Sequence, residues 1–316
     1  MKKTLIALAA VAVAGAASAQ VTLYGKVDLG YKNTTTKDAA GVVTDKFSGM
    51  SSGNQSGSRW GLKGTEDLGG GLKASFNYEA SVTANTGAGN DNFARRSVLE
   101  LSGGFGKIGM GRDYNPTFSL IGATDPTGVD GSSIQDYLAG VRDSNMFLYT
   151  TPALGGFTGK LGVVTQRTGE PADKSSVTDM SGTYSAGALM AGLAHRVTKP
   201  TTAGVAGAKT TQTTVGATYD MGMAKAYFNY VTVKVNGSGV TDKETNLGVS
   251  VPMGAVTLLG AVGRDSATGQ KSASDYTFGA DYSLSKMTNV YARVMKNGAI
   301  GGGKTTGMFA GVRHSF

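Results

Sequence analysis

The chain has 316 residues, with 30 lysines and arginines against 22 aspartates and glutamates, which gives a net charge of +8 at pH 7. Because it contains no cysteine, a disulfide-stapled scaffold is excluded, and its 49 glycines show no Gly-X-Y period, so it is not a collagen. Beyond residue 20 no apolar run approaches the roughly 18 residues of a membrane-spanning helix. The aromatic and β-branched content is too high for a disordered chain.

The first residues have the layout of a cleaved secretory signal. Lys2 and Lys3 precede an apolar run over 5–14, and the small residues 17–19 come before Gln20. Such a segment is too short to span a membrane. We therefore expect a signal peptide at 1–19 and a mature chain at 20–316. A retained N-terminal anchor helix is the alternative.

Alternation with a period of two recurs along the rest of the chain. It is clearest at 72–80, 224–232, 275–284 and 289–295, where one face is apolar or aromatic and the other polar or charged. Short glycine-containing turns alternate with long polar loops between such segments, as an up-and-down barrel requires. Counting segments as far as the C-terminus predicts about sixteen strands, which is an even number as in bacterial outer-membrane barrels.

The same alternation would suit a soluble β-sandwich with its apolar face inside. A sandwich of so many strands would need an unusually large core for this length. The polar faces carry many ionisable groups, as a wet lumen would, and terminal aromatic residues suit a membrane interface. We therefore predict an all-β fold, a transmembrane antiparallel up-and-down β-barrel, because a closed barrel satisfies every backbone hydrogen bond in lipid.

The alternation continues to the last residue, where Met308, Ala310, Val312, His314 and Phe316 share one face. Most domains end instead in a few poorly ordered residues. The pattern predicts that Phe316 completes a last strand that pairs with the first one and lies at a membrane interface.

Four ordered motifs, at 58–79 (SRWGLKGTEDLGGGLKASFNYE), 93–115, 141–157 and 310–316, resemble the trimeric general porins of Gram-negative bacteria, most closely the β-proteobacterial type. The resemblance covers essentially the whole mature chain. It implies a homotrimer in the cell outer membrane, in contact with lipid and lipopolysaccharide, whose third external loop folds inward to narrow the channel. It also implies that the barrel-assembly machinery reads Phe316 as a signal; an ordinary last strand with an interfacial aromatic residue is the alternative.

The longest central connection, 115–141, is long for a structureless loop and is therefore expected to be functional. In order along the chain it matches the family's constriction loop. Its acidic candidates for the pore are Asp125, Asp130 and Asp136. The family's usual Pro-Glu-Phe-Gly-Gly signature is absent here, so the resemblance does not place these acids one by one.

Basic residues mark the facing wall. Arg59 shares a face with Lys63, opposite Trp60 and Leu62, so alternation points it into the lumen. The resemblance assigns Arg59 and Arg142 to the basic wall of the family. Further candidate cations on this wall include Arg112.

At 93–101 we expect only one of two neighbouring arginines to face the pore. Simple alternation, with Leu99 and Leu101 on the lipid side, selects Arg96, whereas the family pattern matches Arg95. We favour Arg95, because a wall under an inward loop need not follow the rule for lipid-facing strands. Arginine stays charged at any working pH, and basic walls favour anions. We expect at least a mild anion preference.

Several other functions are set aside. Residues 298–305 satisfy the phosphate-loop pattern, but alternation rather than a helix follows them. No marked nucleophile accompanies the two histidines, so we expect no enzyme, and scattered lysines do not indicate nucleic acid. No cofactor is expected, and the sequence leaves open a calcium ion at loop carboxylates such as Asp91 or Asp143.

The expected function is a passive diffusion channel for ions and small hydrophilic solutes. A substrate-specific channel of the same fold is the nearest alternative, since Phe118 and Tyr137 lie in the long loop, although the two do not form a stripe. A surface adhesin with a plugged lumen is the second alternative, and it would conduct no ions.

Overall fold

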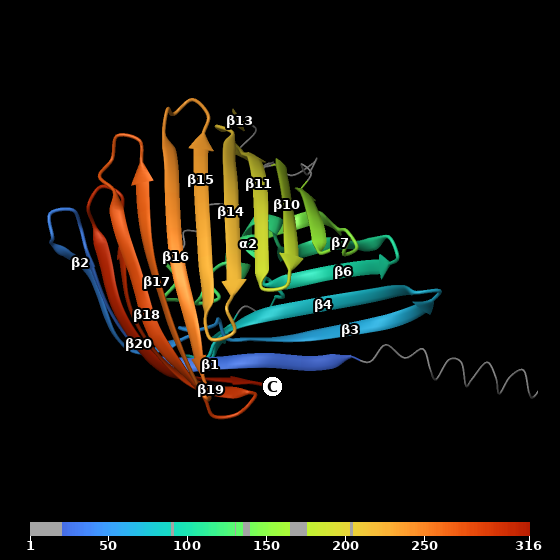
Figure 1. Cartoon of the computed structure of the whole chain (residues 1–316), viewed down its shortest axis with the longest axis horizontal. Coiled ribbons are helices and arrows are strands. Elements are labelled where there is room, and N and C mark those ends of the chain that lie inside the picture. The colour runs from blue at the N-terminus through green and yellow to red at the C-terminus, as the bar shows by residue number, and fades with distance from the viewer. Residues whose placement is uncertain (1–20, 90–91, 130, 135–139, 165–175, 203–204) are drawn as a thin grey trace, which may run out of the picture.

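The computed structural model describes residues 21–89, 92–129, 131–134, 140–164, 176–202 and 205–316. The expected signal at 1–19 lies outside the described residues. Nearly all of the described chain is one antiparallel sheet, which curves into a barrel wall (Figure 1). The sheet closes because the first long strand pairs with the last, from Lys26 opposite Ser315 to Lys37 opposite Lys304.

Each long strand is joined by antiparallel pairing to its neighbours in the wall. The strands are β1 (Thr22–Lys37), β2 (Val43–Ser52), β3 (Arg59–Gly69), β4 (Leu72–Thr83), β6 (Arg96–Gly103), β7 (Gly106–Tyr114), β8 (Arg142–Thr150), β9 (Phe157–Val164), β10 (Ser176–Ala186), β11 (Leu189–Lys199), β14 (Thr210–Asp220), β15 (Lys225–Val235), β16 (Thr241–Met253), β17 (Val256–Ala267), β18 (Ala273–Ser283), β19 (Thr288–Gly298) and β20 (Lys304–Ser315). Both β2 and β3 pair with β1, one beyond the other, and count as one interrupted strand. Seventeen segments thus form sixteen strands, which confirms the predicted barrel.

The remaining elements are short. The two-residue strands are β5 (Ala88–Gly89), β12 (Thr201–Thr202) and β13 (Val205–Ala206), and α2 spans Pro116–Ala123. This helix contacts β9, β10, β11 and β14. Asn115 caps its N-terminus by accepting a 2.7 Å hydrogen bond from the Phe118 N–H. Within the described part of the chain, no helix combines the length and the hydropathy needed to cross a membrane.

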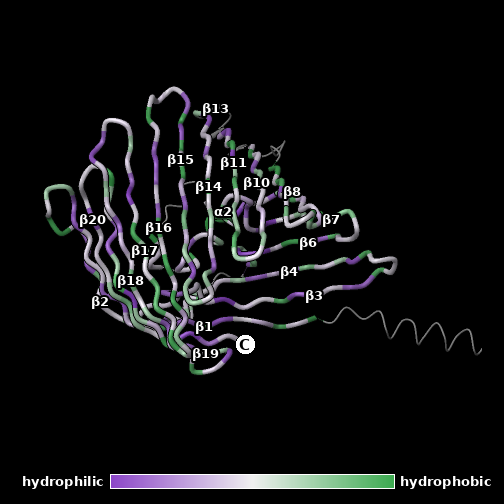
Figure 2. Tube along the Cα trace, viewed as in Figure 1, coloured by the Kyte–Doolittle hydropathy of each residue, from purple (hydrophilic) through white to green (hydrophobic). Residues whose placement is uncertain are grey.

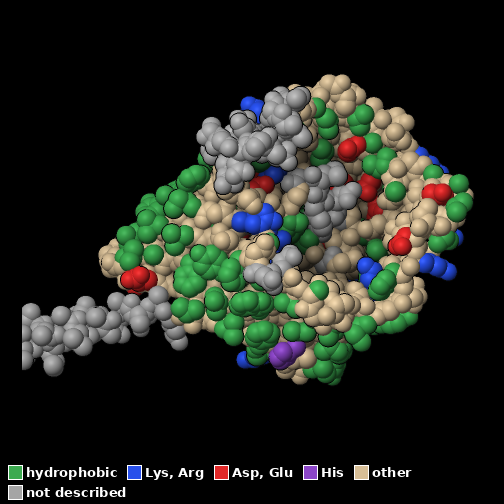
Figure 3. All heavy atoms as spheres, turned by 180° about the vertical axis from the view of Figure 1, so that it is seen from behind, with side chains coloured by type: hydrophobic (Ala, Val, Ile, Leu, Met, Phe, Trp, Pro, Cys, Tyr) green, Lys and Arg blue, Asp and Glu red, His purple; other side chains and the backbone are tan. Residues whose placement is uncertain are grey.

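Alternation sorts the side chains between two faces. On β1, Leu23, Val27 and Tyr31 are exposed on the outside, whereas Asp28 and Thr34 are buried on the inside. Figure 2 shows the same change between hydrophilic and hydrophobic residues along many strands. In Figure 3 hydrophobic side chains cover much of the outer face, and basic side chains lie in the central hollow. Apolar groups that stay exposed over so wide a surface indicate a barrel surrounded by lipid.

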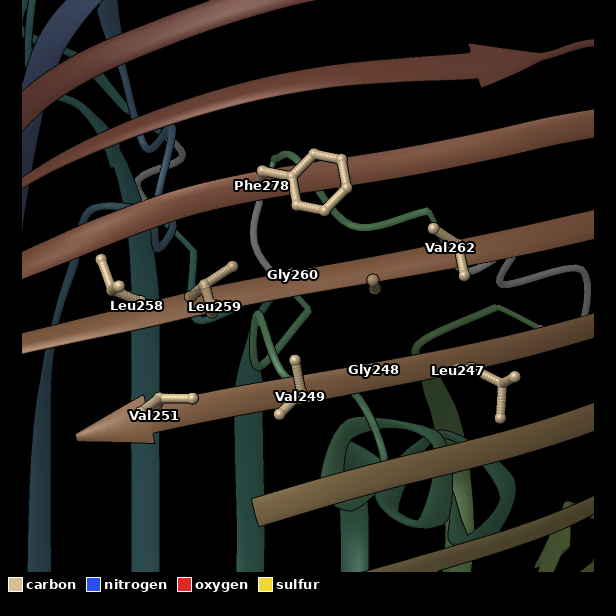
Figure 4. A pocket seen from close by; sticks show the side chains of 10 residues that line it. Leu247, Gly248, Val249, Val251, Leu258, Leu259, Gly260, Val262 and Phe278 are labelled. Carbon is tan, nitrogen blue, oxygen red and sulfur yellow. The ribbon is translucent and has the colours of Figure 1, made fainter. Parts of the chain in front are cut away.

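A shallow apolar hollow on the outer face illustrates this surface (Figure 4). Leu247 and Val249 of β16, Leu258 and Val262 of β17, and Phe278 of β18 line it, and all five are exposed. Its lining has the apolar character expected for contact with acyl chains.

The C-terminus closes the barrel as the sequence predicts. The Phe316 N–H donates to the Gly25 carbonyl at 3.1 Å, and the Gly25 N–H donates to the Phe316 carbonyl at 2.9 Å. A Cβ at position 25 would overlap the Phe316 ring, so Gly25 is what lets the ring lie over β1. Met308, Val312 and Phe316 are all exposed on the outer face.

This arrangement predicts that a charged substitution lowers the stability of the barrel more on the outer face than on the inner face. Leu62 lies opposite Leu23 on the outer face of β3, whereas Thr65 is on the inner face and its hydroxyl lies 3.0 Å from that of Ser75. Leu62→Arg should lower the free energy of unfolding, by a cost that is about 2–4 kcal/mol for a charge at the bilayer midplane and falls to about 0–1 kcal/mol near the interfaces. Thr65→Arg, the matched control, should have little effect. Urea unfolding in lipid vesicles measures both, and equal losses would contradict the assignment of faces.

Candidate pore constriction

Three arginines converge on the inner wall around Glu79 and Tyr114. Arg95 Nε donates to Glu79 Oε1 at 2.6 Å, and Arg59 Nε lies 3.9 Å from Glu79 Oε2. Arg142 Nη2 donates to the Tyr114 hydroxyl at 2.7 Å, and its guanidinium carbon lies 4.3 Å from the centre of that ring. Arg95 also reaches the Tyr114 hydroxyl at 3.5 Å. We call Arg59, Arg95 and Arg142 the arginine cluster.

The cluster has an excess of positive charge. Of its three guanidinium groups, those of Arg59 and Arg95 lie within 4 Å of the carboxylate of Glu79, whereas that of Arg142 is bonded to the Tyr114 hydroxyl, so three positive charges share one negative charge. Glu79 is further occupied by the Tyr24 hydroxyl, which donates to Oε2 at 3.1 Å. This buried carboxylate therefore offsets one of the three positive charges and also orients Arg59 and Arg95.

Tyr114 is the last residue of β7 and lies in the cluster, although alternation from the exposed Met110 would point it outward. Beside it the pairing of β7 with β8 shifts register, because one residue of β7 lies opposite Ser144 and Asn145. The bulge is thus on β8, and bulges bend the strand that carries them. Tyr114 then stacks on Phe118 of α2, with ring centres 5.2 Å apart. The aromatic pair holds Arg142 beside the start of the long loop.

Both Arg95 and Arg96 reach the inner side, so the expectation that only one of them does is wrong. The strand β6 begins at Arg96, so alternation does not extend to Arg95. Arg96 itself is on the inner face and donates to both oxygens of Asp113, at 2.7 and 2.6 Å. Its charge is therefore paired, and the unpaired excess stays with the arginine cluster.

The other two basic candidates differ in placement. Lys63 is on the inner face, with Nζ 5.2 Å from the centre of the Tyr24 ring. Arg112 shares its parity with the exposed Ile108 and Met110 and donates to the Ala94 carbonyl at 2.5 Å and the Ser144 hydroxyl at 2.8 Å. This outward placement contradicts its assignment to the lumen.

Asp125 is the one acidic candidate of the loop that lies in the described residues, and it does not contact the cluster. Asp125 is buried and accepts hydrogen bonds from Thr127, Val129 and Ser133, the last at 2.6 Å. It thus closes a turn inside the loop instead of lining the pore, and burial raises the pKa of its carboxyl above the ordinary value. Asp130 and Asp136 lie outside the described residues.

The described part of 115–141 lies against inward-facing glycines of the wall. At each of four positions a Cβ would come within 2.6–3.1 Å of a loop side chain, closer than packing allows in three of them. The pairs are Gly192 with Leu120, Gly216 with Thr124, Gly248 with Pro126, and Gly263 with Ile134. Asn229 of β15 adds a 2.7 Å hydrogen bond to the Thr124 hydroxyl. Glycines on β11, β14, β16 and β17 therefore make room for the loop inside the barrel.

A buried ionic network fixes the start of the loop. The Thr117 hydroxyl donates to Asp179 at 2.7 Å, and Arg196 bridges Asp179 at 3.1 Å and Asp143 at 2.6 Å. Because Arg196 bonds both oxygens of Asp143, this carboxylate is not free for the calcium ion considered above. The other candidate, Asp91, lies outside the described residues. No group of three metal-ligating side chains was found in the described part of the chain.

Sequence reasoning missed the residues that orient the arginines. Glu79 was on the polar face of 72–80, so alternation had the signal to find it. Alternation with the exposed Leu193 also had the signal to find Arg196, which anchors the loop. Tyr114 had no such signal, because alternation from Met110 would point it outward.

The outer apolar surface and the lumen of charged side chains define a transmembrane channel barrel. Residues 4–298 match the family model for Gram-negative porins. The chain therefore belongs to the Gram-negative porin family and is an outer-membrane porin, through which ions and small hydrophilic solutes diffuse passively. Its relatives are channel proteins, so it is not an enzyme.

Individual relatives agree with this assignment. The chain is 35% identical to outer membrane porin protein 32 of Delftia acidovorans, over the full length of both. The solved anion-selective porin from Comamonas acidovorans superposes with a TM-score of 0.82 at 29% identity, covering 95% of this chain and 100% of that one. The trimer form of OmpT of Vibrio cholerae, with a TM-score of 0.67 and 15% identity over 94% of this chain and 99% of that one, shares the fold.

The glycines under the loop yield a testable prediction. Gly216→Val should force Thr124 away from the wall, because a Cβ there would lie 2.7 Å from Thr124 Cγ2. Overpacking of this kind costs about 1–3 kcal/mol, and thermal unfolding should detect it. Ala217→Val adds nearly the same atoms to the outer face of the same strand and should cost less than about 0.5 kcal/mol. Equal stability of the two variants would show that the loop does not rest on Gly216.

Proposed function

We propose that this porin prefers anions and that the arginine cluster sets the preference. The observation that carries the proposal is the excess of guanidinium groups over carboxylates around Glu79 and Tyr114. Arginine keeps its charge across all working pH values, and basic walls attract anions into a narrow aqueous gap. The similarity to a solved porin that is named anion-selective supports the proposal.

We further propose that residues 115–141 narrow the channel opposite the cluster. The cluster comes from β3, from the residue before β6 and from β8, whereas Leu120, Thr124 and Pro126 contact glycines of β11, β14 and β16. The two groups thus occupy different arcs of the barrel wall. Ions would pass between the arginines and the loop, with Lys63 and Arg96 on the same inner face as the arginines.

The assembly we propose is a homotrimer in a membrane of lipid and lipopolysaccharide. The trimer form of a porin with the same fold supports the oligomeric state. We also propose that the barrel-assembly machinery reads Phe316. Its support is the exposed ring at the end of β20, which the backbone pairing with Gly25 holds on the outer face.

Serine substitutions test the arginine cluster. Replacing Arg59, Arg95 or Arg142 singly by Ser should lower the anion-to-cation permeability ratio by up to about thirtyfold each, because one charge at about 4 Å in water favours an anion by about 1 kcal/mol and disfavours a cation by as much. Arg112→Ser, which removes a nearby charge from the outer face, should leave the ratio unchanged. The reversal potential across a salt gradient measures the permeability ratio of each variant. A ratio that falls in Arg112→Ser as much as in the cluster variants would contradict the proposed site.

The C-terminal aromatic residue is tested in cells and in vitro. Phe316→Ser should reduce the amount of folded porin in the outer membrane several-fold, since the assembly signal is lost. The same variant refolded into detergent should keep the wild-type conductance, because Phe316 lies far from the lumen face. If Phe316→Ser assembles in cells as well as the wild-type porin, Phe316 is not an assembly signal. If the refolded variant loses its conductance, the Phe316 side chain is needed for the structure of the channel.

A further inference from the structure

We propose that Asp28 is a positioning residue for the constriction. It holds residues 53–58 inside the barrel, where this segment touches two members of the arginine cluster and the far part of the long loop. We call 53–58 the inner segment. This inference rests on the proposed anion preference. It identifies the contacts that keep the arginine cluster in place.

The inner segment interrupts the barrel wall beside β1. Leu29 pairs with Ser52 at the end of β2, and Lys26 pairs with Arg59 at the start of β3. Only Val27 and Asp28 lie between these pairs on β1, whereas six residues, 53–58, lie between them on the other side. The four extra residues cannot stay in the ladder, so they leave it toward the lumen.

Asp28 supplies the hydrogen bonds that the ladder no longer provides. Its Oδ2 accepts from the N–H groups of Gln55 at 2.7 Å and Ser56 at 2.6 Å, and its Oδ1 accepts from the Tyr291 hydroxyl at 2.5 Å. Its own N–H donates to the Ser58 hydroxyl at 2.9 Å, and its carbonyl accepts from Gly53 at 2.9 Å. With an exposure of 0%, this carboxylate is bonded on both oxygens and shielded from water.

The side chain of Gln55 ties the inner segment to a more distant part of the wall. Its Nε2 donates to Asp281 of β18 at 2.6 Å, and its Oε1 accepts from Asn289 of β19 at 3.0 Å. Asp281 in turn receives two hydrogen bonds from Arg293, at 3.0 and 3.1 Å. The segment is therefore held by β1 on one side and by β18 and β19 on the other.

Three contacts connect the inner segment to the constriction. Ser56 accepts a 2.8 Å hydrogen bond from Arg59 Nη2, and Gly57 lies so close to Arg95 that a Cβ there would be 3.1 Å from its Nη1. The Asn54 carbonyl accepts from the Gly131 N–H at 2.8 Å. Movement of the inner segment would therefore remove a hydrogen bond of Arg59, the surface against which Arg95 packs and an anchor of the loop, all together.

Asp28→Asn separates positioning from electrostatics. Loss of one negative charge inside the barrel would, by its charge alone, raise the anion-to-cation permeability ratio. We expect the ratio to fall instead, with a higher single-channel conductance and more current noise, because the arginines and the loop are no longer fixed. Asp113→Asn is the matched control: it removes a similarly buried carboxylate that binds Arg96 instead of the inner segment. In that variant the ratio should stay unchanged or rise.

A gentler variant keeps the test independent of folding. Tyr291→Phe removes only one of the three hydrogen bonds to the Asp28 carboxylate and should shift the ratio and the noise in the same direction, by less. If Asp28→Asn or Tyr291→Phe raises the ratio, or leaves it unchanged while Arg59→Ser lowers it, the positioning role is wrong and the proposed function stands. If Arg59→Ser also leaves the ratio unchanged, the proposed anion site itself has failed, and this inference fails with it.

Discussion

Hydrocarbon offers no hydrogen-bond partners, so each backbone N–H and C=O at membrane depth must be satisfied within the chain. The closed pairing of β1 with β20 meets this constraint, and it also fixes which residues line the lumen. Once the sheet is closed, the alternation of side chains fixes which face each residue occupies. Leu23 and Val27 face lipid, while Asp28 faces inward. The backbone hydrogen bonds that close the barrel thus also determine which charged residues line the channel.

Segments that leave the ladder must find their hydrogen bonds elsewhere, and buried carboxylates provide them. Asp28 holds residues 53–58, Asp179 holds Thr117 at the start of the long loop, and Asp125 closes a turn within it. Glycines on the wall give these segments space. Asp125, the one acid offered as a pore-lining group that lies in the described residues, is therefore used to build the lumen, as Asp28 and Asp179 are, and none of the three pairs with the arginine cluster.

Much of the fold follows from local sequence, because alternation and glycine turns act over a few residues. The inward positions of Arg59 and Lys63 follow from the same rule, and the rule would also have placed Arg112 outside, with Ile108 and Met110. The rest depends on departures from the ladder. β6 starts one residue after Arg95, Tyr114 lies inside although alternation from Met110 would point it outward, and 53–58 fold inward although the sequence there shows only a polar stretch. Such departures are set by partners distant in the chain, such as Tyr291 for Asp28.

The central claim is that arginines outnumber carboxylates where the channel is narrowest. The reversal potential of the wild-type protein in a planar bilayer, across a tenfold gradient of potassium chloride, tests it most directly, since the two ions have nearly equal mobility in water and the sign then reports the charge of the wall. A potential with the sign of chloride permeation is the result that our account predicts. A potential near zero, or one with the sign of potassium, would contradict it.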